Sequence, residues 1–302
     1  MKRGILLGID SLGSDRQHGA SQICRKAAEL LLKVLLQGDS ISSAEFFPLM
    51  RTILDSQPSM APLINLCNKV MFFVERGRRG EAVEYLREVV SGGDKEILSM
   101  TKAVISLMER ARRVVIFSYS STVVRVLTAS KLSLPVLTHI GYPLGDGESS
   151  ARSLVERGFK VVITSDLCLA GMLGKGDIVL TGCDAITPTF WVNRAGTYPL
   201  ALAAKEKGVP LIVVTETSKF LPKSLTPWLR LKPAPEGELV VECGKCKVVH
   251  GYFERVPLTL ISKVVVPEGE FDPDKVVEMT NHNAEVSVLL SRATFDTKGA
   301  SL

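Results

Sequence analysis

Short apolar runs that alternate with segments of helical spacing dominate the sequence after Arg113. The strand-length runs are 114–117, 135–137, 160–163, 177–180, 210–214 and 262–266, and the helical segments are 120–131, 149–157, 166–173, 192–207 and 272–280. Strands that are apolar throughout need cover on both faces, which helices between parallel strands provide. Residues 113–302 are therefore predicted to form a doubly wound α/β domain with a parallel sheet.

The first 112 residues show a different pattern, in which apolar side chains recur at helical spacing. The predicted helices are 18–36, one opened by a capping box at Ser42 and Glu45, 58–74, 80–90 and 94–112. Two domains follow from this change of pattern: a helical N-terminal domain over residues 1–112 and the α/β domain over residues 113–302.

Composition narrows the class of protein. Of the 302 residues 46% are hydrophobic and 23% are charged, which is typical of a soluble globular chain. The formal net charge of +5 favours small anionic ligands, but no Lys/Arg block indicates direct contact with nucleic acid. No apolar run reaches the roughly 18 residues of a membrane span, so no membrane partner is expected. No cofactor is assigned either, because no Gly-x-Gly-x-x-Gly motif for a dinucleotide follows the first strand.

Six cysteines occur in apolar segments, which predicts reduced thiols and a cytoplasmic location. Cys243 and Cys246, with His250 four residues on, form half of a zinc-site pattern, but a closed site needs four ligands. The simpler interpretation is a hairpin around Gly244 within a surface excursion over residues 221–248, so no metal site is assigned.

Polar side chains follow five successive strands at the points where these strands end. The loops are 118–122, 138–147, 164–166, 181–184 and 215–219, and four of them carry carboxylates. Ligands of open parallel sheets bind outside the carboxyl ends of the strands, so these loops predict a polar cleft. Helix capping explains part of the Ser, Thr and Asp content. His139, at a strand end, is either an acid or base or a hydrogen-bonded support residue.

The sharpest local signal is Gly182-Cys183-Asp184. The glycine allows a turn at the strand end, and the carboxylate of Asp184 then faces the cleft, where it can move a proton on a bound sugar or hold its hydroxyls. Cys183 is interpreted as a packing residue.

A second motif, Asn193-Arg194-Ala195-Gly196-Thr197, is predicted at the start of the next helix. Arg194 can hold a phosphate through two hydrogen bonds there, while the helix N-terminus and Thr197 add donors.

These two motifs, together with residues 196–210, resemble the initiation factor 2B alpha/beta/delta family. That family also contains methylthioribose-1-phosphate isomerases and archaeal ribose-1,5-bisphosphate isomerases. The resemblance extends to residues 58–63, Lys219-Phe220 and residues 253–257. It implies a helical domain followed by a Rossmann-like domain, and a cytoplasmic protein that forms a homodimer or a higher homo-oligomer.

The isomerases of this family carry a catalytic Cys–Asp pair and several phosphate-binding arginines. By resemblance the aspartate is Asp184 and the paired asparagine is Asn193, while Arg194 replaces a usual lysine. Tyr119 stands at the position of the cysteine, within the Ser118-Tyr119-Ser120-Ser121 loop that resembles the regulatory subunits. The Arg-Gly-Ala phosphate motif is His18-Gly19-Ala20 here, and Gln57 and Tyr142 stand where further arginines are expected.

The motifs and the resemblance leave three candidate functions for this protein. The first is a regulatory protein, similar to factor 2B, that binds a sugar phosphate or a nucleoside monophosphate and whose partner is the alpha subunit of initiation factor 2. The second is an aldose–ketose isomerase of a phosphorylated ribose, which would use Asp184 with His139 or Tyr119. A phenol, whose pKa is about 10, is a poor replacement for a thiol in proton transfer, so the first function is favoured. A dinucleotide-dependent oxidoreductase is disfavoured because no Gly-x-Gly-x-x-Gly motif follows the first strand.

Overall fold

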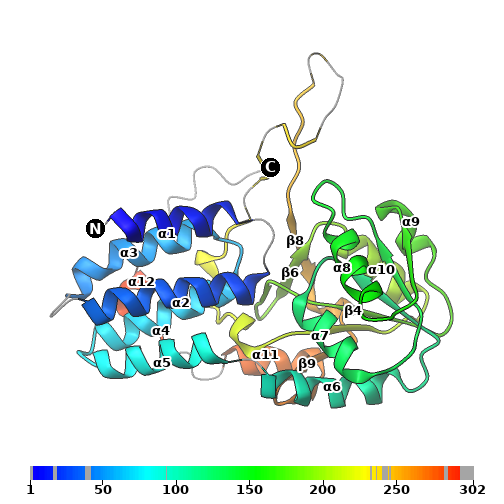
Figure 1. Cartoon of the computed structure of the whole chain (residues 1–302), viewed down its shortest axis with the longest axis horizontal. Coiled ribbons are helices and arrows are strands. Elements are labelled where there is room, and N and C mark those ends of the chain that lie inside the picture. Colours follow the sequence, from blue (N-terminus) through cyan, green and yellow to red (C-terminus); the bar gives the residue numbers. More distant parts are fainter. Residues whose placement is uncertain are drawn as a thin grey trace. The chain divides into compact units, whose positions relative to one another are not determined.

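The computed structural model describes residues 3–15, 19–37, 42–92, 94–231, 233–235, 237–239, 244, 246–281 and 285–292. The chain forms two compact units (Figure 1). The helical unit contains residues 1–92, 221–230 and 280–302, and the sheet unit contains residues 93–220 and 231–279. A domain boundary at residue 113 stays a prediction. No helix in the described ranges has the length and apolar character needed to cross a membrane.

The helical unit is built from helices packed around a shared apolar core, in which α4 is buried on nearly all sides. Its elements are α1 (Arg3–Ser14), α2 (Ala20–Gln37), α3 (Ser43–Ser56), α4 (Ala61–Val74), α5 (Arg79–Ser91), the 3-10 helix η2 (Thr226–Trp228) and α12 (Val288–Arg292). The capping box predicted for α3 is confirmed, because Ser42 and Glu45 hydrogen-bond to each other's backbone N–H groups. α1 was not among the helices predicted from the sequence.

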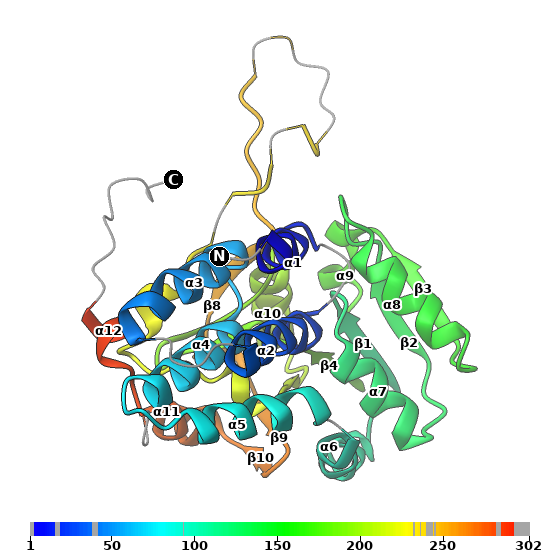
Figure 2. The same ribbon diagram turned by 60° about the vertical axis from the view of Figure 1, so that its left-hand side comes forward.

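A seven-stranded sheet forms the centre of the sheet unit. Its strands are β1 (Arg113–Phe117), β2 (Val136–His139), β3 (Val161–Thr164), β4 (Asp177–Thr181), β7 (Leu211–Val214), β9 (Lys263–Val266) and β10 (Gly269–Phe271). The spatial order is β10-β9-β7-β4-β1-β2-β3, and every neighbouring pair is parallel except β10 with β9. The predicted parallel sheet is therefore confirmed. Figure 2 shows β1, β2 and β3 side by side, with β3 outermost.

Helices cover both faces of this sheet. They are α6 (Asp94–Met108), α7 (Ser121–Ser130), α8 (Asp146–Val155), α9 (Asp166–Gly171), α10 (Thr197–Glu206) and α11 (Pro273–Asn281). Successive strand residues point to opposite faces. Val114 and Ile116 accordingly pack with α6, α7 and α8, whereas Val115 and Phe117 pack with α9, α10 and α11. The core is thus two apolar layers with the sheet between them, as doubly wound folds require.

One predicted element is wrong. The helix expected over residues 192–207 begins only at Thr197, and the residues before it form β6 (Phe190–Arg194). β6 lies between β5 (Ala185–Ile186) and β8 (Phe253–Pro257) in a three-stranded antiparallel sheet. Pairing with the preceding β5 and with the distant β8 overrides the local helical pattern. Gly196, at φ 100°, makes the turn into α10.

The segment that follows Phe220 also differs from the prediction of a surface excursion. Leu221, Leu225 and Trp228 are buried in the helical unit, and the indole N–H of Trp228 donates to the carbonyl of Leu290 at 3.0 Å. Burial of these apolar side chains therefore determines where the segment lies, although its Pro- and Lys-rich composition is typical of a surface loop.

An excursion begins only further along the chain, where Pro233 and Gly251 form an antiparallel bridge. Gly244 is described, but Cys243 lies outside the described residues. Cys246 is disulfide-bonded, which corrects the expectation of six reduced cysteines.

The two-layer core predicts a clear contrast between buried and exposed leucines of the sheet unit. Leu137 in β2 is fully buried, whereas Leu98 in α6 is 59% exposed. Leu137→Ala is expected to lower the free energy of unfolding by about 2–5 kcal/mol because it leaves a cavity. Leu98→Ala, the matched control, should change it by about 0.5 kcal/mol or less. Denaturant unfolding measures both, and equal losses would contradict this account of the core.

Candidate functional site

The candidate site lies at the carboxyl ends of the parallel strands of the sheet unit. Ser118 follows β1, His139 ends β2 and Asp184 comes shortly after β4. Lys219 ends η1 (Thr217–Lys219), which follows β7. Since these strands are parallel neighbours, the polar loops predicted from the sequence share one edge of the sheet.

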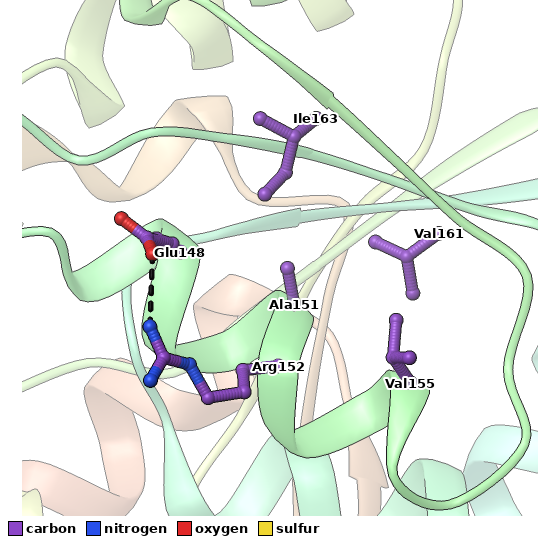
Figure 3. Close-up of a pocket in the computed structure, with 6 residues that line it drawn as sticks. All are labelled: Glu148, Ala151, Arg152, Val155, Val161 and Ile163. Atoms are coloured by element: carbon purple, nitrogen blue, oxygen red, sulfur yellow. Dashed lines mark hydrogen bonds and ion pairs between the residues drawn. The ribbon is translucent and has the colours of Figure 1, made fainter.

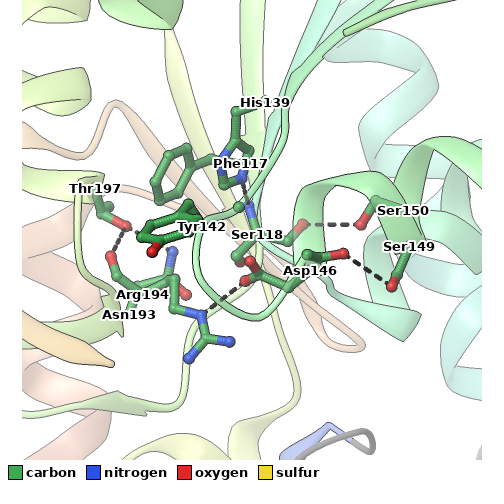
Figure 4. A network of polar contacts seen from close by, with 12 residues as sticks. Phe117, Ser118, His139, Tyr142, Asp146, Ser149, Ser150, Asn193, Arg194 and Thr197 are labelled. Atoms are coloured by element: carbon green, nitrogen blue, oxygen red, sulfur yellow. Dashed lines mark hydrogen bonds and ion pairs between the residues drawn. The ribbon is translucent and has the colours of Figure 1, made fainter. Parts of the chain in front are cut away.

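His139 is the centre of a chain of hydrogen bonds at this edge (Figure 4). Its Nε2 accepts a hydrogen bond from the backbone N–H of Ser118 at 2.8 Å, and its Nδ1 lies 2.8 Å from Oδ1 of Asp166. Because Nε2 accepts, the ring proton is on Nδ1 and is donated to Asp166. The ring is buried and stacks on Phe117 with centroids 4.1 Å apart. Both ring nitrogens are engaged, so this geometry matches the support role considered for His139.

Ser118 adopts a left-handed backbone conformation, with φ 63°, which is costly for a residue that is not glycine. Both of its backbone groups are held: the N–H by His139 and the carbonyl by the hydroxyl of Ser150, at 3.0 Å. This restraint fixes the start of the loop that carries Tyr119, Ser120 and Ser121. Such a restrained outlier is common where a loop must be positioned for function.

Asp166 lies at the other end of this series of hydrogen bonds. Its carboxylate also accepts hydrogen bonds from the backbone N–H groups of Gly141 and Tyr142. Burial by itself raises the pKa of Asp166, but the hydrogen bond from His139 and the two backbone donors outweigh it, so the pKa is lowered. Asp166 is therefore a carboxylate at neutral pH and orients the imidazole.

Arg194 forms an ion pair with Asp146, the first residue of α8. Its Nε donates to Oδ2 of Asp146 at 2.7 Å, and its guanidinium lies 5.4 Å from the ring centre of Tyr252. The two terminal nitrogens form no hydrogen bond with any residue in the described ranges. Figure 4 shows the contact of Arg194 with Asp146 and no contact of the terminal nitrogens with the other side chains drawn. A guanidinium that is held at Nε and open at its two Nη atoms can bind a phosphate through two hydrogen bonds.

Asn193 and Thr197, by contrast, are buried supports. The side-chain amide of Asn193 donates to the hydroxyls of Thr181 and Thr197, at 3.1 and 3.0 Å, and the hydroxyl of Thr197 donates to the carbonyl of Arg194. These bonds hold the end of β6 and the turn into α10.

The N-terminus of α10 is occupied as well. Glu254 in β8 accepts hydrogen bonds from the backbone N–H groups of Gly196 and Tyr198, at 2.9 and 2.7 Å. A carboxylate of the chain thus fills the position that the sequence analysis reserved for a phosphate. In this structure the donors of this helix end and the hydroxyl of Thr197 are engaged within the chain, and their contact with a ligand stays a prediction.

Asp184 is half-buried, and its carboxylate forms no hydrogen bond or ion pair with any residue that the structure describes. Burial raises its pKa, and Asp146 adds to this, while the cations of Lys219 and Arg194 oppose it. Lys219 is buried, yet Glu216, Cys183 and Asp184 keep its pKa above the ordinary value although burial lowers it. Asp184 is therefore an unpaired carboxylate beside two cations.

Cys183 packs next to this carboxylate. Its thiol lies 3.2 Å from the hydroxyl of Thr215, and burial raises its pKa to about 12, so it stays protonated at neutral pH. Gly182 is needed for close approach, because a Cβ there would lie 2.5 Å from Oγ of Ser120. The turn after β4 and the loop after β1 are thus in contact.

The remaining predicted site residues fall into three groups. Tyr119 and Ser121 are half-buried, and Tyr142 is 64% exposed. Gly19, Ala20 and Gln57 belong to the helical unit, where the amide of Gln57 donates to the carbonyls of Leu12 and Asp15. His18 lies outside the described residues. A role of Gly19, Ala20, Gln57 or His18 in ligand binding stays a prediction.

Four carboxylates matter here that the sequence analysis did not assign to the site. Asp146 and Asp166 stand in the polar loops after β2 and β3, and Glu216 in the loop after β7, so position alone could have indicated them. Glu254 pairs across strands with Asn193. The place of Glu254 in the site could be inferred only after β6 was recognised as a strand. Among the described residues, no group of three or more His, Cys, Asp or Glu side chains could hold a metal ion.

Comparison with known proteins establishes the family. A model of the Initiation factor 2 subunit family matches residues 16–273, which is most of the chain, so the protein belongs to this family. The ribose 1,5-bisphosphate isomerase of Archaeoglobus fulgidus is 28% identical over 293 residues, covering 89% of this chain and 90% of that protein. A putative translation initiation factor eIF-2B subunit 2-like protein of Pyrococcus horikoshii is 29% identical over 214 residues, covering 69% and 76%. The family predicted from the sequence is confirmed.

Solved structures confirm the fold. Translation initiation factor eIF-2B of Pyrococcus horikoshii has a TM-score of 0.80 at 24% identity, covering 92% of this chain and 100% of that one. The 5-methylthioribose 1-phosphate isomerase of the same organism has a TM-score of 0.68 at 16% identity, with coverages of 91% and 87%. The tetrameric eIF2B-beta2-delta2 complex of C. thermophilum has a TM-score of 0.70 at 15% identity, with coverages of 91% and 92%.

The raised pKa of Asp184 predicts how stability depends on pH. A carboxyl whose pKa is higher in the folded state contributes stability below its unfolded pKa, about 3.9, and loses it as pH rises through the folded pKa. At neutral pH the buried charge therefore opposes folding. Asp184→Asn should raise the free energy of unfolding there, and the gain should shrink as the pH is lowered towards the ordinary aspartate value.

Denaturant unfolding across this pH range measures the effect. Asp274→Asn, at an exposed position of α11, is the matched control and should show little change. An Asp184→Asn protein that is less stable than wild type at neutral pH would contradict the assigned environment of Asp184.

Proposed function

We propose that this member of the Initiation factor 2 subunit family binds a sugar phosphate or a nucleoside monophosphate at the carboxyl edge of its sheet. The observation that carries the proposal is the unpaired, half-buried carboxylate of Asp184 beside the open guanidinium of Arg194. Buried charges are normally paired, so an open pair of opposite charges at the ligand-binding edge of a parallel sheet favours a ligand that has both an anion and hydroxyl groups.

Three side chains would contact or attract this ligand, and each suits a different part of it. The two Nη atoms of Arg194 suit two oxygens of one phosphate, and Asp146 holds the guanidinium in place through Nε. Asp184 accepts hydrogen bonds from sugar hydroxyls. Lys219 adds positive charge without contact to solvent, since it is buried and lies 3.8 Å from Glu216.

A regulatory role in translation initiation fits these residues. Tyr119 stands where the resemblance places a catalytic cysteine, and the thiol of Cys183 stays protonated at neutral pH. Gln57 replaces an expected arginine and is engaged within the helical unit. A chain of this kind would act in the cytoplasm, associate with itself and contact the alpha subunit of initiation factor 2. Relatives named as eIF-2B subunits and a tetrameric structural neighbour support this proposal.

The raised pKa of Asp184 favours a second candidate, an aldose–ketose isomerase of a phosphorylated ribose. In that reaction the carboxylate would take a proton from one sugar carbon and return it to the neighbouring carbon, with no net change in protons or electrons. The relative named ribose 1,5-bisphosphate isomerase supports this candidate. Of the two partners first considered for Asp184, both nitrogens of His139 are engaged. The hydroxyl of Tyr119, which is half-buried, forms no hydrogen bond with any residue that the structure describes.

Ligand-induced thermal shifts test the site. Ribose 1,5-bisphosphate, 5-methylthioribose 1-phosphate, AMP and inorganic phosphate are each added to wild type and variants, and every variant is compared with its own ligand-free melting temperature. Arg194→Lys should weaken binding of a phosphorylated ligand about tenfold or more, because an ammonium cannot make the two-pronged contact. Arg157→Lys, at an exposed site, is the control and should bind like wild type. Equal affinities of both variants would contradict the assigned role of Arg194.

Product analysis of any bound sugar phosphate separates the two candidates. The regulatory proposal expects binding without conversion in wild type. Conversion that Asp184→Asn abolishes and Asp274→Asn preserves would establish the isomerase instead. If wild type binds none of the four compounds, the ligand-binding proposal is wrong, whichever role the protein has.

A further inference from the structure

We infer that the amino-terminal edge of the seven-stranded sheet binds the phosphate backbone of a double-stranded nucleic acid. This edge lies at the opposite ends of the strands from the candidate site, so the inference goes beyond the function proposed there. The segments that lead into the neighbouring strands β4, β1, β2 and β3 are residues 174–177, 109–113, 131–135 and 156–160. They contain seven basic and three acidic residues, so this edge carries most of the formal net charge of +5.

Backbone hydrogen bonds hold these segments side by side. The N–H of Arg112 donates to the carbonyl of Gly176 at 2.7 Å, and the N–H of Val136 donates to the carbonyl of Lys160 at 2.9 Å. The side chain of Arg112 lies directly over Gly176, where a Cβ would be 2.9 Å from Cδ of the arginine. The sheet therefore collects positive charges from four separate parts of the chain, which is why no continuous basic block appears in the sequence.

Most of the cations on this edge lack an internal partner. Arg113 is neutralised by Asp177 at 2.7 Å, and two exposed acids, Glu109 and Glu156, lie in the same segments. Five exposed cations form no hydrogen bond or ion pair through their side chains with any residue that the structure describes, and these are Arg110, Arg112, Lys131, Lys160 and Lys175. The edge therefore keeps an excess of positive charge.

Helix capping is the alternative explanation, because cations stabilise the carbonyl end of a helix. Lys207 has this role, since its Nζ donates to the carbonyls of Gly171 and Leu173 at the end of α9, at 2.7 and 3.0 Å. Arg152 instead forms an ion pair with Glu148 at 2.9 Å, and both line a hollow between α8 and β3 (Figure 3). The five cations of the amino-terminal edge make neither kind of contact within the described residues, so they are available to an external anion.

The composition of this edge favours a phosphate backbone over a protein partner. Protein interfaces depend on a few large apolar or aromatic side chains, and single-stranded nucleic acids stack their bases on aromatic rings. These four segments, all of which the structure describes, contain no exposed large hydrophobic side chain. Their one aromatic residue, Phe159, packs against the core. Duplex phosphates, by contrast, are bound by cations alone, with release of counterions.

The width of the edge also suits a duplex. Neighbouring strands lie about 4.8 Å apart, so four strands place these cations along a row of about 14 Å. The major groove of duplex DNA is about 12 Å wide, so such a row reaches phosphates on both sides of one groove. Contacts of this kind carry no base specificity, and we therefore expect binding that does not depend on the sequence of the duplex.

Titration of labelled duplexes tests this inference. A short DNA duplex and an RNA duplex of the same sequence are each titrated with the full chain, and fluorescence anisotropy is followed at two salt concentrations. Wild type should bind both. Replacing three of the five cations should raise the dissociation constant at least about tenfold and lower the slope of log K against log salt by about three. This edge variant is Lys131→Gln, Lys160→Gln and Lys175→Gln combined.

A second triple variant with the same change in net charge is the matched control, and it should keep wild-type affinity and salt dependence. It replaces three exposed lysines away from this edge, Lys33→Gln, Lys102→Gln and Lys223→Gln. Thermal unfolding checks that both variants are folded.

The outcomes separate the possible partners. Tighter binding of RNA than of DNA would support the inference with RNA as the source of the phosphates, and equal binding would support the shared backbone. Equal losses in the two triple variants would overturn it, because net charge rather than this edge would then attract the duplex. A wild type that binds neither duplex would overturn it as well. Polyglutamate that binds as tightly as the duplexes, through the same three lysines, would overturn it in favour of an acidic protein. Small ligands are measured separately, so this inference and the proposed function can fail independently.

Discussion

The hydrogen bond from the backbone N–H of Ser118 to His139 determines how the loops at the sheet edge can be arranged. Because Ser118 has a left-handed conformation, the loop after β1 needs a fixed acceptor at that point, and the imidazole provides it only while Asp166 holds its other nitrogen. A buried ring with both nitrogens engaged orients its neighbours well but cannot exchange protons with a ligand. Among the described groups near the sheet edge, Asp184 remains as the carboxylate without a partner.

Internal neutralisation of charge limits what this edge can bind. Asp146 holds Arg194, Glu216 lies beside Lys219, and Glu254 fills the N-terminus of α10. In the described part of the edge, the terminal nitrogens of Arg194 are therefore the cationic donors that remain open to the proposed phosphate. A site with one such position suits a monophosphate better than a bisphosphate, since each phosphate needs its own set of donors. A single open set of donors therefore favours the proposed regulatory ligand-binding role over turnover of a bisphosphate.

The sequence predicted the parallel sheet because apolar runs of strand length keep their character wherever they lie in the fold. Asp184 was selected for a similar reason, since a residue after a strand end is placed by the sheet alone. Arg194 was assigned to the start of a helix, whereas it is the last residue of β6. The roles of both residues in ligand binding stay predictions. The prediction from sequence failed at β6, where pairing with β5 and β8 decides the conformation, and at Trp228, which is buried in a unit remote in sequence. The role of Glu254 depends on cross-strand pairing that local spacing does not encode. The roles of Gln57 and the rest of the phosphate motif depend on the helical unit and stay predictions.

The edge of the sheet and the candidate site are joined by a short piece of chain. β3 ends at Thr164, and two residues later Asp166 begins α9 and holds His139. Thr164 is also bonded through its carbonyl to the N–H of Ile140, directly after His139. A contact that stiffens β3 therefore restrains the carboxylate that orients the imidazole, and through it the conformation of Ser118. Since ordering a loop beforehand lowers the entropy lost when a ligand binds, this restraint on the loop after β1 would favour binding of the proposed ligand.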